Sequence, residues 1–363
     1  MYQIKCTNGA DLSFVDKYAP KILSVINEYL TKNRTKKLTI NNQEIIIGVD
    51  KDSLTFKFLT SISTIEKLKK YLLLSPISQF KIVEKLHKCA YEDELIFKKI
   101  CKSRYEKYHK NGIIPFDHFN EICYDIFVNN GYDDTKKKPI FDKKEFITNT
   151  GINVCPYCGS EFIKPTDRTK HHIDHFLPKR KYPFFAFSYY NLIPSCVICN
   201  NVPNKGVNDP LFSNKNIPHG ILNPYIFKSN IIRFNLKING MEIYNDNNFE
   251  LLLGFITKEY FLGYNEFFDI SDRYTNFSNF AARYYKYVTK ELKTMPYYVN
   301  LQIDPGWLSK VYKNAFMIDK RDDQPEKEVF SRMKWDIFCQ LTKQNYVGKF
   351  HTKQSPNKPV ELF

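Results

Sequence analysis

The chain has 363 residues, 43% of them hydrophobic, which is enough for one large domain or two ordinary domains with real cores. It has no apolar run of about 18 residues and no basic region followed by an apolar stretch at its start, so we expect neither a membrane span nor a secretory signal. Against 39 Asp and Glu, 54 Lys and Arg give a net charge of +15, which favours polyanionic partners. Part of this excess follows from a general richness in Lys, Ile, Asn and Tyr, so charge alone does not identify the partner.

The first part of the chain is predicted to be mainly helical. Apolar residues at helical spacing predict a helix within residues 1–35, and alternation over 37–48 predicts a strand pair with its turn at Asn41 and Asn42. Residues 52–74 read as helical up to Pro76, and residues 77–109 as one or two helices with a charged face.

An amphipathic helix over residues 116–129 comes next, and His118 in it is expected to be a structural or surface residue. Residues 129–139 are predicted to form a loop whose basic run, Lys136–Lys138, is either an exposed charged turn, which we favour, or a nucleic-acid contact. A short helix over 140–150 then leads into the central segment.

Two Cys-x2-Cys pairs, Cys155/Cys158 and Cys196/Cys199, enclose that central segment. Such a turn lets two thiolates reach one Zn²⁺, and two turns complete a tetrahedral structural site. The alternative is four unrelated cysteines, which this double spacing disfavours. The other five cysteines are scattered and expected to be reduced, which predicts a cytoplasmic protein; they are Cys6, Cys89, Cys101, Cys123 and Cys339.

Between the pairs lies a cluster of imidazoles and one carboxylate. Asp174 and His175 are adjacent, so both can serve one site only where a strand ends or bends, and Pro178 fits such an end. A carboxylate suits Mg²⁺ or Mn²⁺, and a neutral imidazole accepts a proton from water. That pairing suits phosphodiester hydrolysis. His172 adds a second imidazole that could share a face with Asp174, whereas His171 is as readily a structural residue.

These motifs resemble the zinc-bound branch of the HNH, or ββα-metal, endonucleases, over roughly residues 155–206. The residues that carry the resemblance are Cys155/Cys158, Asp174-His175 with Phe176 and Pro178, Asn191-Leu192, Cys196/Cys199-Asn200 and Lys205. The resemblance implies that Asp174 binds a catalytic metal and that His175 is the general base. It also implies that Asn191 orients His175, although Asn191 could instead cap the following turn.

Further roles carried by the resemblance are less defined. Asn200 stands where the family has its last metal ligand, but the longer spacing to Lys205 makes Asn204 a competitor. His172 is expected to bind metal or phosphate. Basic residues beside the site are expected to bind backbone phosphate, with a solvated turn as the alternative for the first three; they are Lys179, Arg180, Lys181 and Lys205.

After a proline-containing loop region, alternation over 231–244 with Asn239-Gly240 predicts a hairpin that leaves Arg233 and Lys237 on a possible exposed face. Residues 248–269 and 272–294 are predicted as helices. The second is rich in aromatic and basic residues, which we interpret as core packing rather than a base-stacking surface. Residues 306–319 and 325–345 are predicted to be helices, and the tail, 348–363, to be loose.

Together these patterns predict a mostly helical α+β protein in which a zinc-bound ββα-metal motif lies between helical N- and C-terminal regions. The expected segments are an N-terminal mainly helical region, 1–139, a nuclease core, 140–225, and a C-terminal hairpin with helices, 226–363. No P-loop and no G-x-G-x-x-G occurs, so any use of nucleotide would need a partner.

The predicted function is metal-dependent endonuclease action on DNA, with structural Zn²⁺ and catalytic Mg²⁺ or Mn²⁺. The alternatives are a zinc-stabilised nucleic-acid-binding or scaffold protein without cleavage, and a nuclease acting on RNA or tRNA. The central motifs also resemble the HNH subunits of bacterial anti-phage defence systems, of the Septu or retron-associated type, which implies an ATPase partner and an antiviral role.

Overall fold

The computed structural model describes most of the chain. Its residues fall into two compact units by their contacts. We call Cys6–Thr150 with Ile173–Ile193 the hairpin unit, and Met1–Lys5 with Gly151–His172 and Pro194–Phe363 the knuckle unit. The predicted ranges 1–139, 140–225 and 226–363 divide the chain differently and remain a prediction. The described residues are 4, 9–32, 34–40, 43–51, 53–83, 115–132, 141–163, 172–202, 204–210, 221–227, 232–239, 246–294, 330–341 and 348–362.

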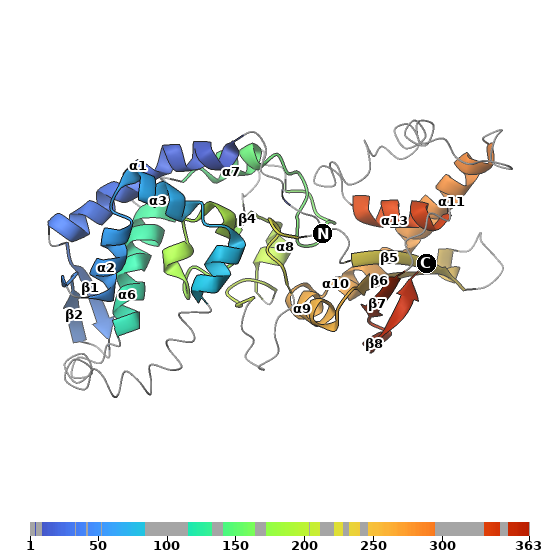
Figure 1. Cartoon of the computed structure of the whole chain (residues 1–363). Coiled ribbons are helices and arrows are strands. Elements are labelled where there is room, and N and C mark those ends of the chain that lie inside the picture. Colours follow the sequence, from blue (N-terminus) through green and yellow to red (C-terminus); the bar gives the residue numbers. More distant parts are fainter. Residues whose placement is uncertain are drawn as a thin grey trace. The chain divides into compact units, whose positions relative to one another are not determined.

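The hairpin unit begins with the long helix α1 (Ala10–Thr31), as predicted (Figure 1). Its buried side chains recur every three or four residues, which turns one apolar face toward the core; they are Phe14, Val15, Tyr18, Ala19, Ile22, Ile26 and Tyr29. The predicted strand pair is also present: β1 (Lys36–Ile40) pairs antiparallel with β2 (Gln43–Ile47). Its turn residues, Asn41 and Asn42, lie outside the described residues.

The helical stretch predicted over 52–74 is two helices, α2 (Leu54–Ser61) and α3 (Ile65–Leu72). Each has a hydroxyl cap at its start, because Ser53 accepts a hydrogen bond from the Phe56 N–H and Thr64 accepts one from the Lys67 N–H. The second cap explains the break, since Thr64 starts a new helix in a sequence whose apolar spacing runs on.

Helix α6 (Pro115–Cys123) confirms the amphipathic helix predicted there, but the chain then continues as a π-helix, η1 (Tyr124–Tyr132), so residues 129–132 are not the loop that was expected from 129. The rest of that predicted loop, 133–139, lies outside the described residues. Helix α7 (Lys143–Thr150) follows. Residues 76–83 are also helical. The predictions for 84–114, for Lys136–Lys138 and for the side chain of His118 lie outside the described residues.

An aromatic cluster forms the core of the hairpin unit. Phe14 of α1 contacts rings from α7 and from the segment 173–193, with ring centroids 5.7 Å from Phe146, 5.3 Å from Phe187 and 5.4 Å from Tyr189. On another side of that segment, the Tyr71 hydroxyl donates to the Phe184 carbonyl. Residues 173–193, although central in the predicted nuclease motif, are therefore built into this core, with Phe185 and Phe187 both fully buried.

The knuckle unit contains a four-stranded antiparallel sheet in the order β5-β6-β7-β8. The strands are β5 (Ile232–Ile238), β6 (Phe249–Phe255), β7 (Gly348–Thr352) and β8 (Ser355–Leu362). Its helices are α9 (Lys258–Phe268), α10 (Ile270–Thr275), α11 (Ser278–Thr294) and α13 (Ser331–Leu341) (Figure 1). The helix predicted over 272–294 is thus α10 and α11, and α13 confirms part of the helix predicted over 325–345.

The sheet corrects three predictions. A tight turn at Asn239-Gly240 would pair Ile238 with Met241, but Ile238 pairs with Phe249, so the predicted hairpin is wrong. The helix predicted from 248 begins only at Lys258, because the apolar run before it is the strand β6, which is buried on one face and largely half-buried on the other. The tail, predicted to be loose, forms the strands β7 and β8. Pairing of β7 with β6 and of β8 with β7 stabilises these strands, which the polar sequence of the tail does not indicate.

Helix α13 covers the free edge of β5. Asp336 accepts a hydrogen bond from the Phe234 N–H at 3.0 Å, and Gln340 both accepts from the Leu236 N–H and donates to its carbonyl. These contacts protect an edge that would otherwise pair with another chain. Arg233, expected on an exposed face, is buried, whereas Lys237 is exposed. Among the described residues no helix is long and apolar enough to span a membrane.

Candidate active site

The first cysteine pair lies in a tight loop closed by a bridge between Val154 and Phe162. The Cys155 N–H donates to the Glu161 carbonyl, and the Gly159 N–H donates to the Cys155 carbonyl, both at 2.8 Å. Gly159 has φ 69°, a left-handed conformation that only glycine adopts without cost. The loop therefore turns both thiols to one side.

The second pair lies at the start of the short helix α8 (Val197–Asn200). Cys196 is its N-cap, and its sulfur accepts a hydrogen bond from the Cys199 N–H at 3.4 Å. The Asn200 N–H donates to the Cys196 carbonyl and the Lys205 N–H donates to the Cys199 carbonyl. Helical geometry thus places these two thiols one turn apart, on the same side of the helix start.

All four sulfurs come together in the knuckle unit. The Sγ atoms of Cys155, Cys158, Cys196 and Cys199 lie within 4.8 Å of one another, and all four residues are buried. Sulfurs around a tetrahedral zinc, with bonds of about 2.3 Å, stand about 3.8 Å apart, so a small closing movement suffices. Four thiols with no oxygen donor suit Zn²⁺ and not Mg²⁺. The predicted cysteine cluster is confirmed and fits structural zinc.

Residues far along the chain surround this cluster, and no sequence motif indicates them. The Arg273 guanidinium, on α10, donates to the Cys199 sulfur at 3.3 Å and to the Ser160 hydroxyl at 3.4 Å. The Tyr274 hydroxyl donates to the Cys158 carbonyl, and the Phe330 N–H donates to the Gly159 carbonyl at 2.8 Å. Arg273 and Tyr274 were interpreted only as parts of a helix rich in aromatic and basic residues.

The charge of Arg273 favours the thiolate of Cys158, whereas burial raises the pKa of Cys155 and hydrogen bonds with the other thiols raise the pKa of Cys199. Burial would raise the pKa of Cys158, but hydrogen bonds from the neighbouring thiols and the positive charge of Arg273 outweigh burial and hold this pKa well below its usual value. Burial would likewise lower the pKa of Arg273, yet the negative charge at Cys158 and Cys199 raises it. A zinc ion with four thiolates carries a net negative charge, and Arg273 offsets part of it.

The segment between the cysteine pairs forms a short hairpin of β3 (Ile173–His175) and β4 (Leu192–Pro194). At one end the Ser195 N–H donates to the His172 carbonyl, and at the other the Phe176 N–H donates to the Asn191 carbonyl. In chain order, β3, β4 and α8 give the strand–strand–helix sequence that the resemblance implies. The strand β3 ends at His175, as the adjacent acid and imidazole required.

His175 is buried and held by its ring. Its Nε2 lies 3.0 Å from the Ala186 carbonyl oxygen. A carbonyl only accepts, so Nε2 carries the proton in this contact and Nδ1 is the basic nitrogen of the neutral ring. The Tyr132 ring lies edge-on to His175, with centroids 4.4 Å apart. His175 is therefore fixed in one orientation and one tautomer.

Asn191 is fully buried and holds the loop that follows His175. Its Oδ1 accepts from the Leu177 N–H at 2.7 Å, and its Nδ2 donates to the carbonyls of Leu177 and Phe185 at 3.1 and 3.0 Å. Phe185 directly precedes Ala186, the partner of His175. Asn191 thus ties together both stretches of chain that position the imidazole.

The other predicted metal ligands differ in their burial and in their hydrogen bonds. Asp174 is buried in β3, and His172 is half-buried just before it. Asn200 is half-buried at the end of α8, and the Asn204 side chain donates to the Ile198 carbonyl at 2.7 Å. Asp174 belongs to the hairpin unit and both asparagines to the knuckle unit, so a shared ion remains a prediction from the resemblance.

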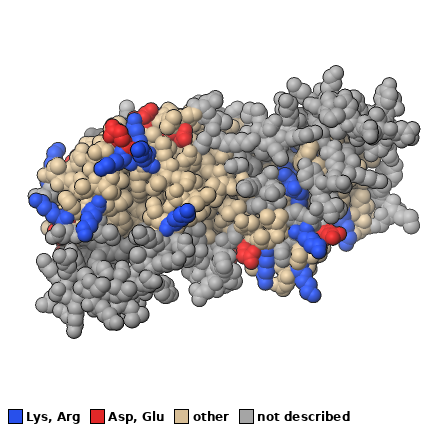
Figure 2. Space-filling model, viewed as in Figure 1, with Lys and Arg blue, Asp and Glu red and all other residues tan. Residues whose placement is uncertain are grey.

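The predicted phosphate-binding residues also differ. Arg180 and Lys181 are exposed on the turn after Pro178, and Lys179 is half-buried there. Lys205 is fully buried, so its ammonium does not reach solvent in this conformation. On the face shown in Figure 2, the described Lys and Arg side chains form separate groups, with acidic side chains beside some of them. The predicted phosphate contacts are thus concentrated in the turn 179–181.

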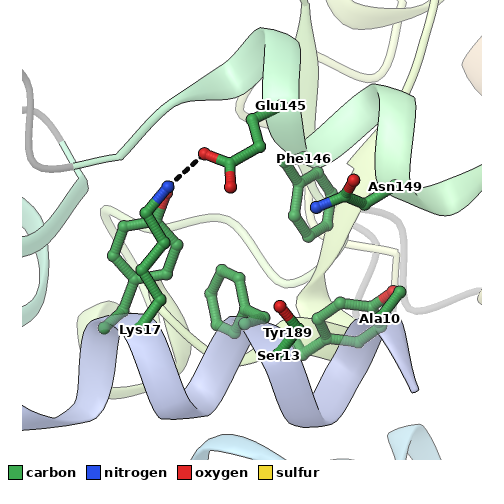
Figure 3. A pocket seen from close by; sticks show the side chains of 9 residues that line it. Ala10, Ser13, Lys17, Glu145, Phe146, Asn149 and Tyr189 are labelled. Carbon is green, nitrogen blue, oxygen red and sulfur yellow. Dashed lines mark hydrogen bonds and ion pairs between the residues drawn. The ribbon is translucent and has the colours of Figure 1, made fainter.

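One hollow in the hairpin unit lies between α1 and α7, with an empty volume of about 280 Å³ that includes open solvent (Figure 3). Phe14, Phe146 and Tyr189 line it, and Lys17 forms an ion pair with Glu145 at its rim. Its two charged residues satisfy each other, and none of the predicted catalytic residues lines it. It therefore does not compete with the hairpin as the candidate site.

Comparison with known proteins agrees with this geometry. Residues 155–205 match the family model described as HNH endonuclease. The match starts at the first cysteine of the cluster, ends at Lys205 and contains the whole hairpin. It supports a nuclease at the level of the family.

A second similarity extends beyond that segment. The chain is 27% identical over 177 residues to the protein ea31 of Escherichia phage lambda, which covers 48% of this chain and 49% of that protein. The alignment thus spans about half the length of the relative. No solved structure matches the chain.

Proposed function

We propose that the chain is a metal-dependent endonuclease that hydrolyses phosphodiester bonds of DNA, with His175 as the general base. The observation that carries this proposal is the contact between the His175 Nε2 and the Ala186 carbonyl. It fixes a proton on Nε2, so Nδ1 is the proton acceptor of the neutral ring, which is the form needed to take a proton from attacking water. The HNH family match over the same segment and the net charge of +15 support it.

The protein's own contribution to the reaction is the placement of one base. The Ala186 carbonyl fixes the tautomer, Asn191 holds the two chain stretches around it, and the Tyr132 ring limits rotation of the imidazole. A base that is already oriented loses little entropy when the substrate arrives. After bond cleavage, the same Nδ1 returns its proton to solvent.

The proposed metals have separate tasks. Zn²⁺ would be held by the four cysteines and would fix the first knuckle loop to the start of α8. Mg²⁺ or Mn²⁺ would be held by Asp174 with Asn200 or Asn204, and it would supply charge stabilisation to the phosphate. His172 would bind metal or phosphate beside them, and Lys179, Arg180 and Lys181 would bind the nucleic-acid backbone.

The test is a nicking assay on supercoiled plasmid with and without Mg²⁺ or Mn²⁺. We expect metal-dependent cleavage by the wild type and a loss of about 10²- to 10⁴-fold in His175→Ala, the usual contribution of a general base. Zinc content and the unfolding midpoint of the variant should stay close to those of the wild type. Cleavage by His175→Ala at the wild-type rate would show that another residue is the base.

The same assay separates the alternatives. Single-stranded DNA and tRNA as substrates decide whether RNA is the target. Binding of DNA without metal-stimulated cleavage would instead support a zinc-stabilised binding or scaffold protein.

The biological setting that we propose is anti-phage defence in the bacterial cytoplasm, with an ATPase partner. The support is the resemblance of the central motifs to defence-system HNH subunits and the lack of a P-loop or G-x-G-x-x-G motif in this sequence. Expression in bacteria with and without the genes next to it, followed by phage challenge, tests this role. Equal plaque counts in all strains would refute it.

A further inference from the structure

Three elements of the hairpin unit meet at the Tyr132 ring. Tyr132 is the last residue of the π-helix η1, Lys143 is the first residue of α7, and Lys179 lies in the turn after β3. The Lys143 ammonium lies over the Tyr132 ring at 4.9 Å from its centroid, and the Lys179 ammonium lies over it at 5.0 Å. One buried ring thus collects two positive charges from distant parts of the sequence.

This cluster is directly beside the proposed base, because His175 contacts the same ring at 4.4 Å between centroids. Each ammonium therefore lies no farther from the centre of the imidazole than the sum of its own distance to the Tyr132 centroid and the distance between the two ring centroids. That spacing suits a phosphate adjacent to the one being cleaved. Lysine ammonium groups commonly bind backbone phosphate, so both side chains carry the charge that such a ligand needs at this position.

The surroundings fix each member of the cluster. The Tyr132 hydroxyl donates to the Ile173 carbonyl of β3 at 3.4 Å, and Phe141 contacts its ring at 5.1 Å. The Asp142 carboxylate caps α7 by accepting from the Glu145 N–H at 2.9 Å, which sets the position of Lys143. A π-helix is rare and is frequently found at functional sites.

We propose that Lys143 and Lys179 together bind a backbone phosphate of the nucleic acid beside His175, and that Tyr132 positions both ammonium groups. This inference rests on the proposed function for the identity of the ligand. It adds Lys143 as a phosphate-binding residue and Tyr132 as a positioning residue, neither of which the sequence motifs contain. Cation–π contact with the ring holds both ammonium groups in place beside His175.

The test compares Lys143→Gln with Lys144→Gln in the full chain, because Lys144 is the exposed neighbour on the same helix. The probe is a short DNA duplex without Mg²⁺ or Mn²⁺, titrated at several salt concentrations. We expect Lys143→Gln to weaken binding by roughly fivefold and to reduce the salt slope by about 0.9, the value for one phosphate contact. Lys144→Gln should bind as the wild type does.

Two further variants test the positioning role. Tyr132→Phe keeps the ring and should retain binding, whereas Tyr132→Leu should lose as much affinity as Lys143→Gln. Lys143→Arg, which restores the charge, should recover most of it. If Tyr132→Leu fails to fold, the lysine pair still decides the matter.

The outcomes separate this inference from the proposed function. Equal affinity and salt slope in Lys143→Gln and Lys144→Gln would overturn the inference even if the wild type cuts DNA. Binding that depends on Lys143 in a protein that never cuts would uphold the inference while the nuclease proposal fails. A wild type that binds no nucleic acid would overturn it as well.

Discussion

The cysteine cluster and the His175 hairpin are neighbours in sequence but are held by different forces. The cluster gathers its four sulfurs through two local turns, a left-handed Gly159 and a helix N-cap at Cys196. The hairpin has only short strands, and its shape depends on buried side chains, chiefly Asn191 and the aromatic core. A metal ion would fix one half of this small motif, whereas the other half needs the surrounding fold.

The largest expected effect comes from breaking the cluster. Cys158→Ser removes one of the four buried thiols and leaves an incomplete tetrahedron, so the variant should lose its zinc and at least about 5 kcal/mol of stability. Metal analysis and thermal unfolding measure both. Cys339→Ser is the matched control, since Cys339 is an equally buried thiol outside the cluster. Full zinc content in Cys158→Ser would contradict the structural role.

Asn191→Ala should destabilise the His175 hairpin in a comparable way. It removes three hydrogen bonds to buried backbone groups of Leu177 and Phe185, and we expect a cost of about 2–4 kcal/mol in urea unfolding. Zinc content should not change, which distinguishes this variant from the cysteine change. Asn129→Ala is the control, because Asn129 makes an exposed side-chain bond to Asp125. Equal stability of the two variants would mean that Asn191 does not hold the loop.

A third variant tests whether the cysteine cluster also depends on residues far along the chain. Arg273→Met removes the guanidinium that donates to Cys199, and zinc should leave roughly tenfold faster in a competition assay with a chromogenic chelator. Arg273→Lys keeps the positive charge, so its rate of zinc release should lie between those of the wild type and Arg273→Met. Arg283→Met, on the exposed face of α11, should release zinc at the wild-type rate. An unchanged rate in Arg273→Met would make the knuckle a purely local structure.

The smallest expected effect concerns the local turn itself. Gly159→Ala forces a Cβ into a conformation with φ 69° and should cost about 1 kcal/mol, seen as a modest fall in the unfolding midpoint. Gly48→Ala is the control, since its Cβ would only touch the Thr35 methyl at an ordinary 3.4 Å. A larger loss, with release of zinc, would show that this turn determines where the thiols point.

Short sequence patterns predict the features of this protein that depend on closely spaced residues. The two Cys-x2-Cys pairs predicted the cluster, the period of α1 predicted its buried face, and the Asp174-His175-x-x-Pro178 pattern predicted where β3 ends. Each of these needs only a few consecutive residues, because turns, helices and strand ends follow from local backbone geometry.

The remaining features depend on contacts between segments that lie far apart in the sequence. Arg273 reaches Cys199 across 74 positions, β5 pairs with β6 and not across Asn239-Gly240, and the polar tail becomes β7 and β8. Tyr132 likewise meets His175, Lys143 and Lys179 only because η1, α7 and β3 pack together. The physical reason is that burial and hydrogen bonding between distant segments outweigh the weak local preferences that sequence patterns report.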